Sequence, residues 1–147
     1  MDSLIPLIRE ITAADAAAAA NLSGELGYQV SADAMRQRIE SLLRHPDQAI
    51  YVASLSGKVV AWIDLAVTWH LTSEPRVEIA GLVVSSEVRS RGIGRLLVER
   101  AEQWAVSRGL TGMLVRSRIT REDAHRFYLR EGYERTKTQA VFTKELA

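Results

Sequence analysis

The sequence predicts an α/β protein of one domain, residues 1–147, in which a single mixed, mostly antiparallel sheet carries helices on both faces. Three observations predict this fold class. Apolar, strand-like segments alternate with segments whose apolar residues recur at helical spacing. Two of the strand segments, about 49–55 and 59–68, are joined by Ser56-Gly57-Lys58, a short connection that suits an antiparallel hairpin. The length is that of one ordinary domain.

Capping residues and glycines mark the predicted helices of the first half. Thr12, with Asp15 three residues later, resembles a capping box that begins a helix towards residue 26, and Gly27 ends it. Ser31 is a good N-cap for a second helix, whose apolar residues 35, 39, 42 and 43 share one face. Strands are expected at 5–11 and 76–84, with the polar residues 70–75 as a loop before the latter.

The clearest element of the second half is a helix after Gly92 that ends at Gly109. Its apolar residues form one stripe: Ile93, Leu96, Leu97, Ala101, Trp104 and Ala105. A strand at 112–116, a helix at 122–131 closed by Gly132, and two short strands near 133–136 and 140–144 complete the prediction.

Composition excludes several classes of protein. Cysteine is absent, which removes disulfides, thiolate metal sites and thiol nucleophiles. No stretch approaches the ~18 apolar residues of a membrane span, and no basic leader precedes an apolar core at the N-terminus. We therefore expect a cytoplasmic protein with no membrane partner. The three histidines, at 45, 70 and 125, show no metal-ligand spacing, so no metal is expected.

Charge is divided unevenly between the halves of the chain, although the net charge is only +1. Residues 1–80 carry six basic and ten acidic side chains, and residues 81–147 carry thirteen basic and eight acidic ones. This division favours an anionic partner for the second half, unless the charges simply cover solvated faces. The basic groups are mixed with acidic ones and form no dense stripe, which argues against nucleic acid as a partner.

The segment between the predicted strand 76–84 and the following helix has the features of a phosphate-binding loop. Gly92 and Gly94 let the backbone turn tightly and approach a ligand closely. The N–H groups at the start of a helix, together with its dipole, favour an anion. Arg89, Arg91 and Arg95 can add charge-assisted hydrogen bonds to phosphate. No Gly-Lys-Ser/Thr follows, and Leu97 stands where the dinucleotide fingerprint needs its third glycine, so neither nucleotide loop fits.

Two motifs resemble those of the GNAT superfamily of N-acetyltransferases. The acetyl-CoA signature Arg/Gln-x-x-Gly-x-Gly/Ala is matched by Arg89, Gly92 and Gly94, after the apolar strand Leu82-Val83-Val84. The second motif, a helix with Ala-x-x-Phe-Tyr followed by Gly-Tyr/Phe, is matched at 124, 127, 128, 132 and 133. The order of elements is also similar to that family, so the resemblance covers essentially the whole chain and implies a GNAT-like acyl-CoA acyltransferase fold.

The resemblance implies acetyl-CoA as co-substrate and an acetyl transfer to a primary amine within a ternary complex. Backbone groups of Leu82, Val83 and Val84 would lie along the pantetheine arm. The N–H groups of the following loop and helix start would hold the pyrophosphate: Arg89, Ser90, Arg91, Gly92, Ile93, Gly94 and Arg95. Two positions depart from the family pattern: Ser86 replaces a common proline, and Arg118 replaces an asparagine that usually contacts the pantetheine arm.

Tyr128 and Glu78 are the candidate catalytic residues. A phenol of pKa ~10 is protonated at neutral pH and can donate to the leaving thiolate, so Tyr128 is the expected general acid rather than only a packing residue. Glu78 matches the position of a base in many family members, with Asp64 or water as alternatives and a surface ion pair as the other interpretation. A backbone N–H of Val83 or Val84 would polarise the thioester carbonyl.

The acceptor is not identified by the sequence. The first two helices and the 70–75 loop would form the acceptor side, and their acidic character favours a small cationic amine or a lysine-bearing peptide. Trp62 and Trp69 are candidates for lining its pocket, with the sheet core as the alternative for Trp62. A homodimer, common in the family, stays open, as does a non-catalytic CoA-binding sensor or interaction module on the same fold.

Overall fold

The computed structural model describes residues 5–89 and 91–147 and divides into two compact units, Met1–Val115 and Arg116–Ala147. In the first unit the strands are β1 (Leu7–Glu10), β2 (Gln48–Leu55), β3 (Lys58–His70), β4 (Ser73–Val84) and β5 (Met113–Val115). Its α-helices are α1 (Ala16–Ser23), α2 (Ala32–Leu42) and α3 (Ile93–Ser107). Short 3-10 turns are η1 (Ala13–Asp15), η2 (Gly24–Leu26) and η3 (Ser86–Val88). The second unit contains α4 (Glu122–Arg130).

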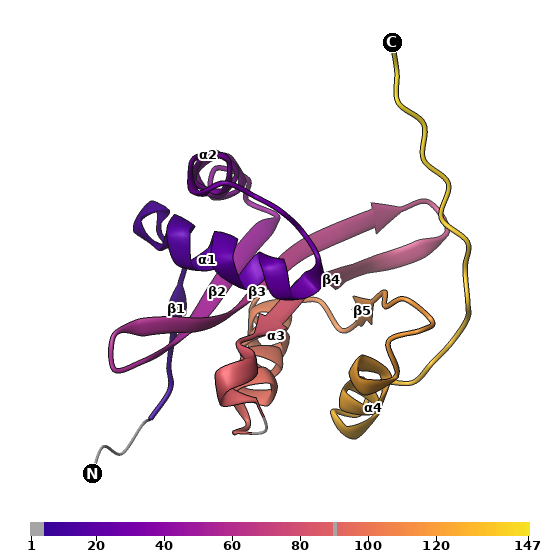
Figure 1. Cartoon of the computed structure of the whole chain (residues 1–147). Helices are drawn as coiled ribbons and strands as arrows, with labels where there is room; N and C mark the ends of the chain where they lie inside the picture. The colour runs from indigo at the N-terminus through magenta and orange to yellow at the C-terminus, as the bar shows by residue number, and fades with distance from the viewer. Residues whose placement is uncertain (1–4, 90) are drawn as a thin grey trace. The chain divides into compact units, whose positions relative to one another are not determined.

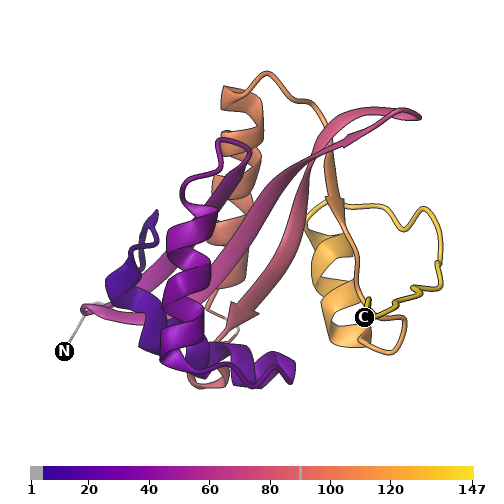
Figure 2. The same ribbon diagram turned by 90° about the horizontal axis from the view of Figure 1, so that it is seen from above.

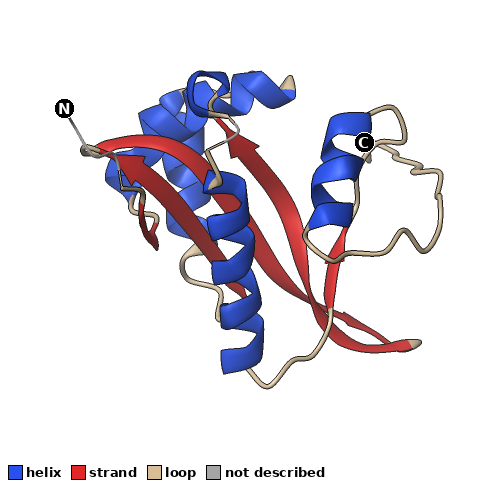
Figure 3. Ribbon diagram, turned by 90° about the horizontal axis from the view of Figure 1, so that it is seen from below, coloured by secondary structure: helices blue, strands red, loops and turns tan. Residues whose placement is uncertain are grey.

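The five strands form one mixed sheet in the order β1-β2-β3-β4-β5 (Figure 1). All neighbours are antiparallel except β4 and β5, which run parallel. Helices α1 and α2 cover one face of the sheet, as seen from above in Figure 2, and α3 crosses the opposite face, as seen from below in Figure 3. The predicted fold class, a mostly antiparallel mixed sheet with helices on both faces, is confirmed.

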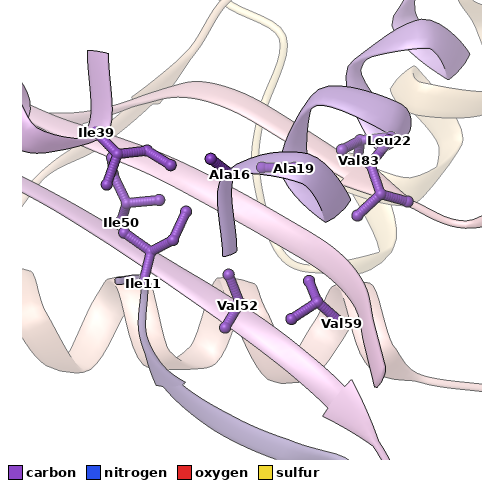
Figure 4. Packing of buried hydrophobic residues seen from close by; sticks show 9 residues of the cluster. All are labelled: Ile11, Ala16, Ala19, Leu22, Ile39, Ile50, Val52, Val59 and Val83. Atoms are coloured by element: carbon purple, nitrogen blue, oxygen red, sulfur yellow. The ribbon is translucent and has the colours of Figure 1, made fainter. Parts of the chain in front are cut away.

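The core on the α1–α2 face is built from small and branched side chains (Figure 4). Alanines at 16 and 19 of α1 are buried, and they allow the helix to approach the strands closely. Alternate residues of β3 point to opposite faces of the sheet. Ile63 and Leu65 are fully buried on the α3 side, whereas Trp62 packs against the α1–α2 cluster.

The predicted capping residues begin the helices as expected. The Thr12 N–H donates to Asp15 Oδ2 at 2.8 Å, which completes a capping box, although the first turn is the 3-10 turn η1 rather than α-helix. Arg9 forms a bidentate ion pair with Asp15 at 2.8 and 2.9 Å and thereby ties β1 to this helix start. Ser31 Oγ accepts from Ala34 N–H at 3.1 Å. The η1 turn and α2 therefore start where a side chain satisfies a free backbone donor.

The two hairpins differ in how well they match the prediction. The β2–β3 connection turns at Ser56 and Gly57, both at positive φ (50° and 82°), as a short hairpin turn requires. The prediction of a loop at residues 70–75 is wrong, because β3 continues to His70, which pairs directly with Ser73 of β4. A two-residue turn closes this hairpin, so the ladder of hydrogen bonds extends further than the polar composition suggested. Pro75 is tolerated because β5 pairs with β4 only from residue 77 onwards.

The second unit contains α4 and a C-terminal segment without regular structure. Helix α4 ends before Gly132, which has φ 91° as expected of a helix-terminating glycine. The two strands predicted near 133–136 and 140–144 are wrong, because residues 133–147 contain neither helix nor strand. Val141 and Phe142 are 81% and 92% exposed, so this segment buries no apolar face, and an isolated hairpin is marginal in water.

Within residues 5–89 and 91–147, no helix is both long enough and apolar enough to cross a membrane.

Candidate functional site

The loop after β4 turns sharply before it enters α3. Ser85 Oγ accepts from the Glu87 N–H at 3.3 Å, and the Val88 N–H donates to the Ser85 carbonyl at 3.0 Å, which shapes the 3-10 turn η3. Gly92 then stands at the N-cap of α3 with φ 79° and ψ 9°. This left-handed conformation is accessible to glycine at little cost and directs the chain into the helix. The predicted site residue Ser90 lies outside the described residues.

The start of α3 presents backbone donors without helical acceptors. The Leu96 N–H donates to the Gly92 carbonyl at 3.1 Å and makes the first hydrogen bond of the helix. The amides of Ile93 and Gly94 precede it and therefore have no acceptor within the helix. Together with the positive end of the helix dipole, such amides favour a bound anion.

The arginines around this helix start have different surroundings. Arg89 donates from Nε to the Val84 carbonyl and from Nη2 to Glu25 Oε1, both at 3.3 Å. Glu25 Oε1 also accepts from the Ser86 N–H at 2.9 Å, so this carboxylate fastens the loop to η2. Arg95 pairs with Glu99 on the surface of α3 at 3.1 Å. Ion pairs between exposed side chains contribute little to stability.

Strands β4 and β5 separate next to this loop. Their parallel pairing covers Val77–Ile79 and Met113–Val115 only. The register of β4 against β3 shifts at Ala80, since Leu65 pairs with Ile79 and Asp64 pairs with Gly81. Among the described residues, the edge of β4 beyond Ile79 therefore has no strand partner on the β5 side. The backbone groups of the predicted residues Leu82, Val83 and Val84 lie along this edge, where an extended ligand can pair with them.

Both candidate bases lie on the same face of the sheet as α1 and α2. Glu78 of β4 lies opposite Ala66 of β3, and Asp64 is two residues before Ala66 on β3. Residues that face each other across an antiparallel pair, and residues two apart on one strand, point to the same side of the sheet, so both carboxylates point to the same side. Glu78 is half-buried. Burial raises the pKa of Asp64 from its ordinary value of 3.8 to about 6. A carboxylate with such a pKa is ionised at pH 8 and can take a proton from an amine.

A cavity of about 340 Å³ opens between α1, α2 and the sheet. Asp64 and Trp62 contribute from β3, and Arg38 contributes from α2. Trp62 lines this cavity and also packs against the core cluster. Trp69 does not line it; this indole is 65% exposed and donates to Asp47 Oδ2 at 3.2 Å.

Tyr128 lies on α4 in the second unit, in a small aromatic group. Its ring makes edge contacts with Phe127 at 5.1 Å and with Tyr133 at 5.7 Å between centroids. Burial raises the pKa of Tyr128 to about 12, and the charge of Arg121 opposes this shift. The phenol is therefore protonated at neutral pH and can donate a hydrogen bond.

The predicted site residues divide between the two units. The phosphate loop, the edge of β4 and Glu78 belong to the first unit, and Tyr128 belongs to the second. Arg118, which replaces the expected asparagine, offers its carbonyl to His125 Nε2 at 2.9 Å in that second unit. In the part of the chain that the structure describes, no group of three or more His, Cys, Asp or Glu side chains can hold a metal ion.

Sequence reasoning missed the cavity residue Arg38. Met35, Ile39 and Leu42 of α2 also line the cavity, and Arg38 interrupts this apolar face at helical spacing. This charged residue within an apolar helix face is visible in the sequence and could have indicated a polar site on that face. The cavity itself combines residues of α1, α2, β2 and β3 with Ile11 and the loop at 28–30, so no single motif records it.

Comparisons with known proteins agree with this architecture. The model of the acetyltransferase (GNAT) family matches residues 16–133. The aminoalkylphosphonate N-acetyltransferase of Salmonella typhimurium is 37% identical over 126 residues, which cover 85% of this chain and 78% of that protein. An uncharacterized N-acetyltransferase of Bacillus subtilis, YhdJ, is 26% identical over 73% of this chain and 75% of its own length.

Solved structures show the same fold. An aminoglycoside N-acetyltransferase in complex with CoA superposes with a TM-score of 0.87 at 19% identity, covering 99% of this chain and 98% of that one. An aminoglycoside 6'-N-acetyltransferase of Acinetobacter baumannii gives a TM-score of 0.84 at 18% identity, covering 97% and 100%. The family model spans well over half of the sequence and a curated relative exceeds 30% identity, so this chain belongs to the acetyltransferase (GNAT) family.

Proposed function

We propose that this protein transfers the acetyl group of acetyl-CoA to the primary amine of a small molecule, by direct attack in a ternary complex. The observation that carries the proposal is the start of α3, where Gly92 turns the chain and the amides of Ile93 and Gly94 stand without helical acceptors. A diphosphate is a suitable anion for such a site. That a structural neighbour of similar fold is bound to CoA supports the same assignment.

The cofactor would extend from the α3 start along the edge of β4. Backbone groups of Leu82, Val83 and Val84 are suited to pair with the amide groups of the pantetheine arm. The thioester would then lie near the separation of β4 and β5, where an N–H of Val83 or Val84 can donate to the carbonyl oxygen as negative charge develops. The proposal requires Tyr128 of the second unit to reach the sulfur of this thioester.

The acceptor amine has to lose a proton before or during attack. An alkylammonium of pKa ~10.4 lies about 3.4 units above neutral pH, so deprotonation costs roughly 4.6 kcal/mol. Glu78 or Asp64 would take this proton directly or through water. The amine nitrogen then forms a bond to the carbonyl carbon, and the carbon–sulfur bond breaks as the Tyr128 phenol donates its proton to the leaving sulfur. The nitrogen loses its second proton to water, and the Tyr128 phenolate takes a proton back from water, so that alkylammonium and thioester give amide, thiol and one released proton.

A small molecule is the acceptor class we favour. The Salmonella typhimurium relative is named for aminoalkylphosphonates, and a structural neighbour was solved with a bisubstrate analogue of CoA and an aminoglycoside. The cavity of about 340 Å³ is at the small end of ligand sites. A lysine-bearing peptide is the alternative that the same assay tests.

The experiment is a CoA-release assay with acetyl-CoA and a panel of aminoalkylphosphonates, amino acids, polyamines, aminoglycosides and lysine peptides. We expect saturable, amine-dependent turnover, and we expect Tyr128→Phe to lower kcat by about 10²-fold or more because the general acid is lost. Tyr133→Phe is the matched control, since this ring lies 5.7 Å from Tyr128, and its kcat should stay within about threefold of wild type. If acetyl-CoA binds but no amine gives turnover, the enzyme proposal fails and a CoA-sensing module takes its place.

A further inference from the structure

Asp64 carries a carboxylate without a partner in the wall of the α1–α2 cavity. Its Oδ1 atom is inaccessible to solvent and makes no hydrogen bond with the described residues. The surrounding walls are mostly apolar, with Ile50 of β2 and Ile39 of α2 among them. A half-buried carboxylate that lacks both a counter-ion and a hydrogen-bond donor is unfavourable in isolation. A cationic ligand supplies both.

Trp62, which lines the same cavity, carries a second buried polar atom without a partner. Its indole Nε1 is buried and has no acceptor among the described residues. Trp62 and Asp64 are two residues apart on β3, so both side chains project from one face of the strand. An indole N–H can only donate. The ligand that satisfies this wall therefore combines an ammonium group with an oxygen acceptor.

Arg38 brings a positive charge to the opposite side of this cavity. It lines the cavity from α2, is exposed, and forms no ion pair or hydrogen bond with the described part of the chain. Its neighbour Arg36, by contrast, lies 3.5 Å from Asp33 and 3.7 Å from Glu40. A guanidinium is well suited to bind a carboxylate or phosphonate through two parallel hydrogen bonds.

We propose that this cavity binds the acceptor as a small zwitterion, whose ammonium group pairs with Asp64 and whose phosphonate or carboxylate pairs with Arg38. The inference rests on the proposed acetyl transfer and specifies its substrate class. Asp64 pairs across the sheet with Gly81, the residue before the edge Leu82–Val84. The ammonium nitrogen is thereby held beside the segment of β4 along which the thioester is expected. Trp62 Nε1 donates to an oxygen of the same acceptor molecule.

Calorimetric titration tests the pocket separately from turnover. The protein is saturated with CoA, which carries no acetyl group to transfer, and is titrated at pH 8 with 2-aminoethylphosphonate, β-alanine or propylamine. We expect wild type to bind at least one of the two zwitterions about tenfold more tightly than propylamine, which lacks the anion. Comparison of the affinities of 2-aminoethylphosphonate and β-alanine shows whether Arg38 binds a phosphonate or a carboxylate more tightly.

Two variants and a matched control assign the roles. Asp64→Asn, which keeps the size of the side chain, should weaken all three amines about tenfold or more, and Arg38→Gln should weaken only the zwitterions. Arg36→Gln, on the same helix but engaged with Asp33 and Glu40, should leave every affinity unchanged. Arg38 is exposed, so its variant reports on the pocket even if Asp64→Asn folds poorly.

The inference is overturned if wild type binds propylamine as tightly as the zwitterions, if it binds none of the three, or if both variants titrate like wild type. The titrations are repeated without CoA. Failure of CoA itself to bind contradicts the proposed function, whereas failure of the amines contradicts only the pocket.

Discussion

Gly81 has no side chain where the indole of Trp62 lies against β4. A Cβ atom at this position would lie 2.8 Å from Cζ3 and 3.0 Å from Cη2 of the ring. Real Cβ contacts are longer, and the ring belongs to the core cluster of the α1–α2 face. The glycine therefore leaves room for the indole of Trp62, which lines the cavity proposed for the acceptor.

We predict that Gly81→Ala lowers the free energy of unfolding by about 1–3 kcal/mol, as expected for overpacking. Urea denaturation followed by tryptophan fluorescence measures it. Gly24→Ala is the control, because its Cβ would meet nothing within 4 Å and its φ of −58° suits alanine; it should be neutral or slightly stabilising. Combining Gly81→Ala with Trp62→Phe should cost less than the sum of the single changes. Strict additivity would show that the ring and the glycine are not in contact.

The elements of the fold were predicted where a local signal fixes them. Thr12, Asp15 and Ser31 are local capping signals, and the positive φ of Gly57, Gly109 and Gly132 is a local backbone requirement. Predictions that depended on long-range pairing were less accurate. The β3–β4 ladder continues through residues whose polar composition suggested a loop, and the expected C-terminal strands do not form, since residues 133–147 contain neither helix nor strand.

The stripe of α3 shows the same limit at the level of packing. Leu96 belongs to the predicted stripe but is 37% exposed, whereas Val98, which was not predicted, is buried to 1% exposure. Periodicity identifies the helix and its approximate face, but the arc that contacts the sheet depends on how α3 crosses β3 and β4. The turn from β4 through Gly92 into α3 was predictable because its residues are contiguous in the sequence. The cavity was not, because residues of α1, α2, β2 and β3 contribute to it together with Ile11 and the loop at 28–30.

The turn into α3 allows a test of the loop as an element. Gly92→Ala forces alanine to adopt φ 79° with no steric clash, which costs about 1 kcal/mol and should displace the amides that follow. Gly57→Ala is a matched control, because Gly57 has φ 82° and a Cβ atom there would also meet no atom within 4 Å. Both variants should lose similar thermal stability, but only Gly92→Ala should weaken acetyl-CoA binding in calorimetry, by about tenfold. Equal cofactor affinity in the two variants would contradict the role of the loop.

The buried carboxylate of Asp64 affects the stability of the whole molecule. Its pKa is about 6 in the folded protein and 3.8 ordinarily, so between these values the native state binds more protons than the unfolded state. The stability that protonated Asp64 contributes is fully present below pH 3.8 and is lost as pH rises through about 6. The protein thus retains at neutral pH a charge that weakens its fold, which is consistent with a binding role for that charge.

We predict that Asp64→Asn is more stable than wild type by about 1–3 kcal/mol at pH 8 and equal to it near pH 4. Arg38 and Glu78 are other charged groups on this side of the sheet, and neither changes in the variant. Chemical denaturation of both proteins across pH 4–8 provides the comparison. A constant difference over this range would show that Asp64 does not titrate between the two pH values.

The charge division between the halves of the chain also acts at the scale of the molecule. The basic second half contains the loop and the arginines proposed to hold the diphosphate, and the acidic first half contains Asp64 and the other residues that line the cavity proposed for the acceptor. Each half thus carries charge opposite to the ligand group proposed for it. The Arg38 guanidinium is the exception, because it is a positive charge on a cavity of the acidic half. It can bind the anionic group of a zwitterion, and a simple cationic amine has no such group.

The central claim is that the amides at the start of α3 hold the diphosphate of acetyl-CoA. Its most direct test is a calorimetric comparison of acetyl-CoA with acetyl-pantetheine, which keeps the thioester and the pantetheine arm but lacks the diphosphate. We predict that acetyl-CoA binds at least about tenfold more tightly, a difference of about 1.4 kcal/mol or more. Equal affinity for the two ligands would contradict the account.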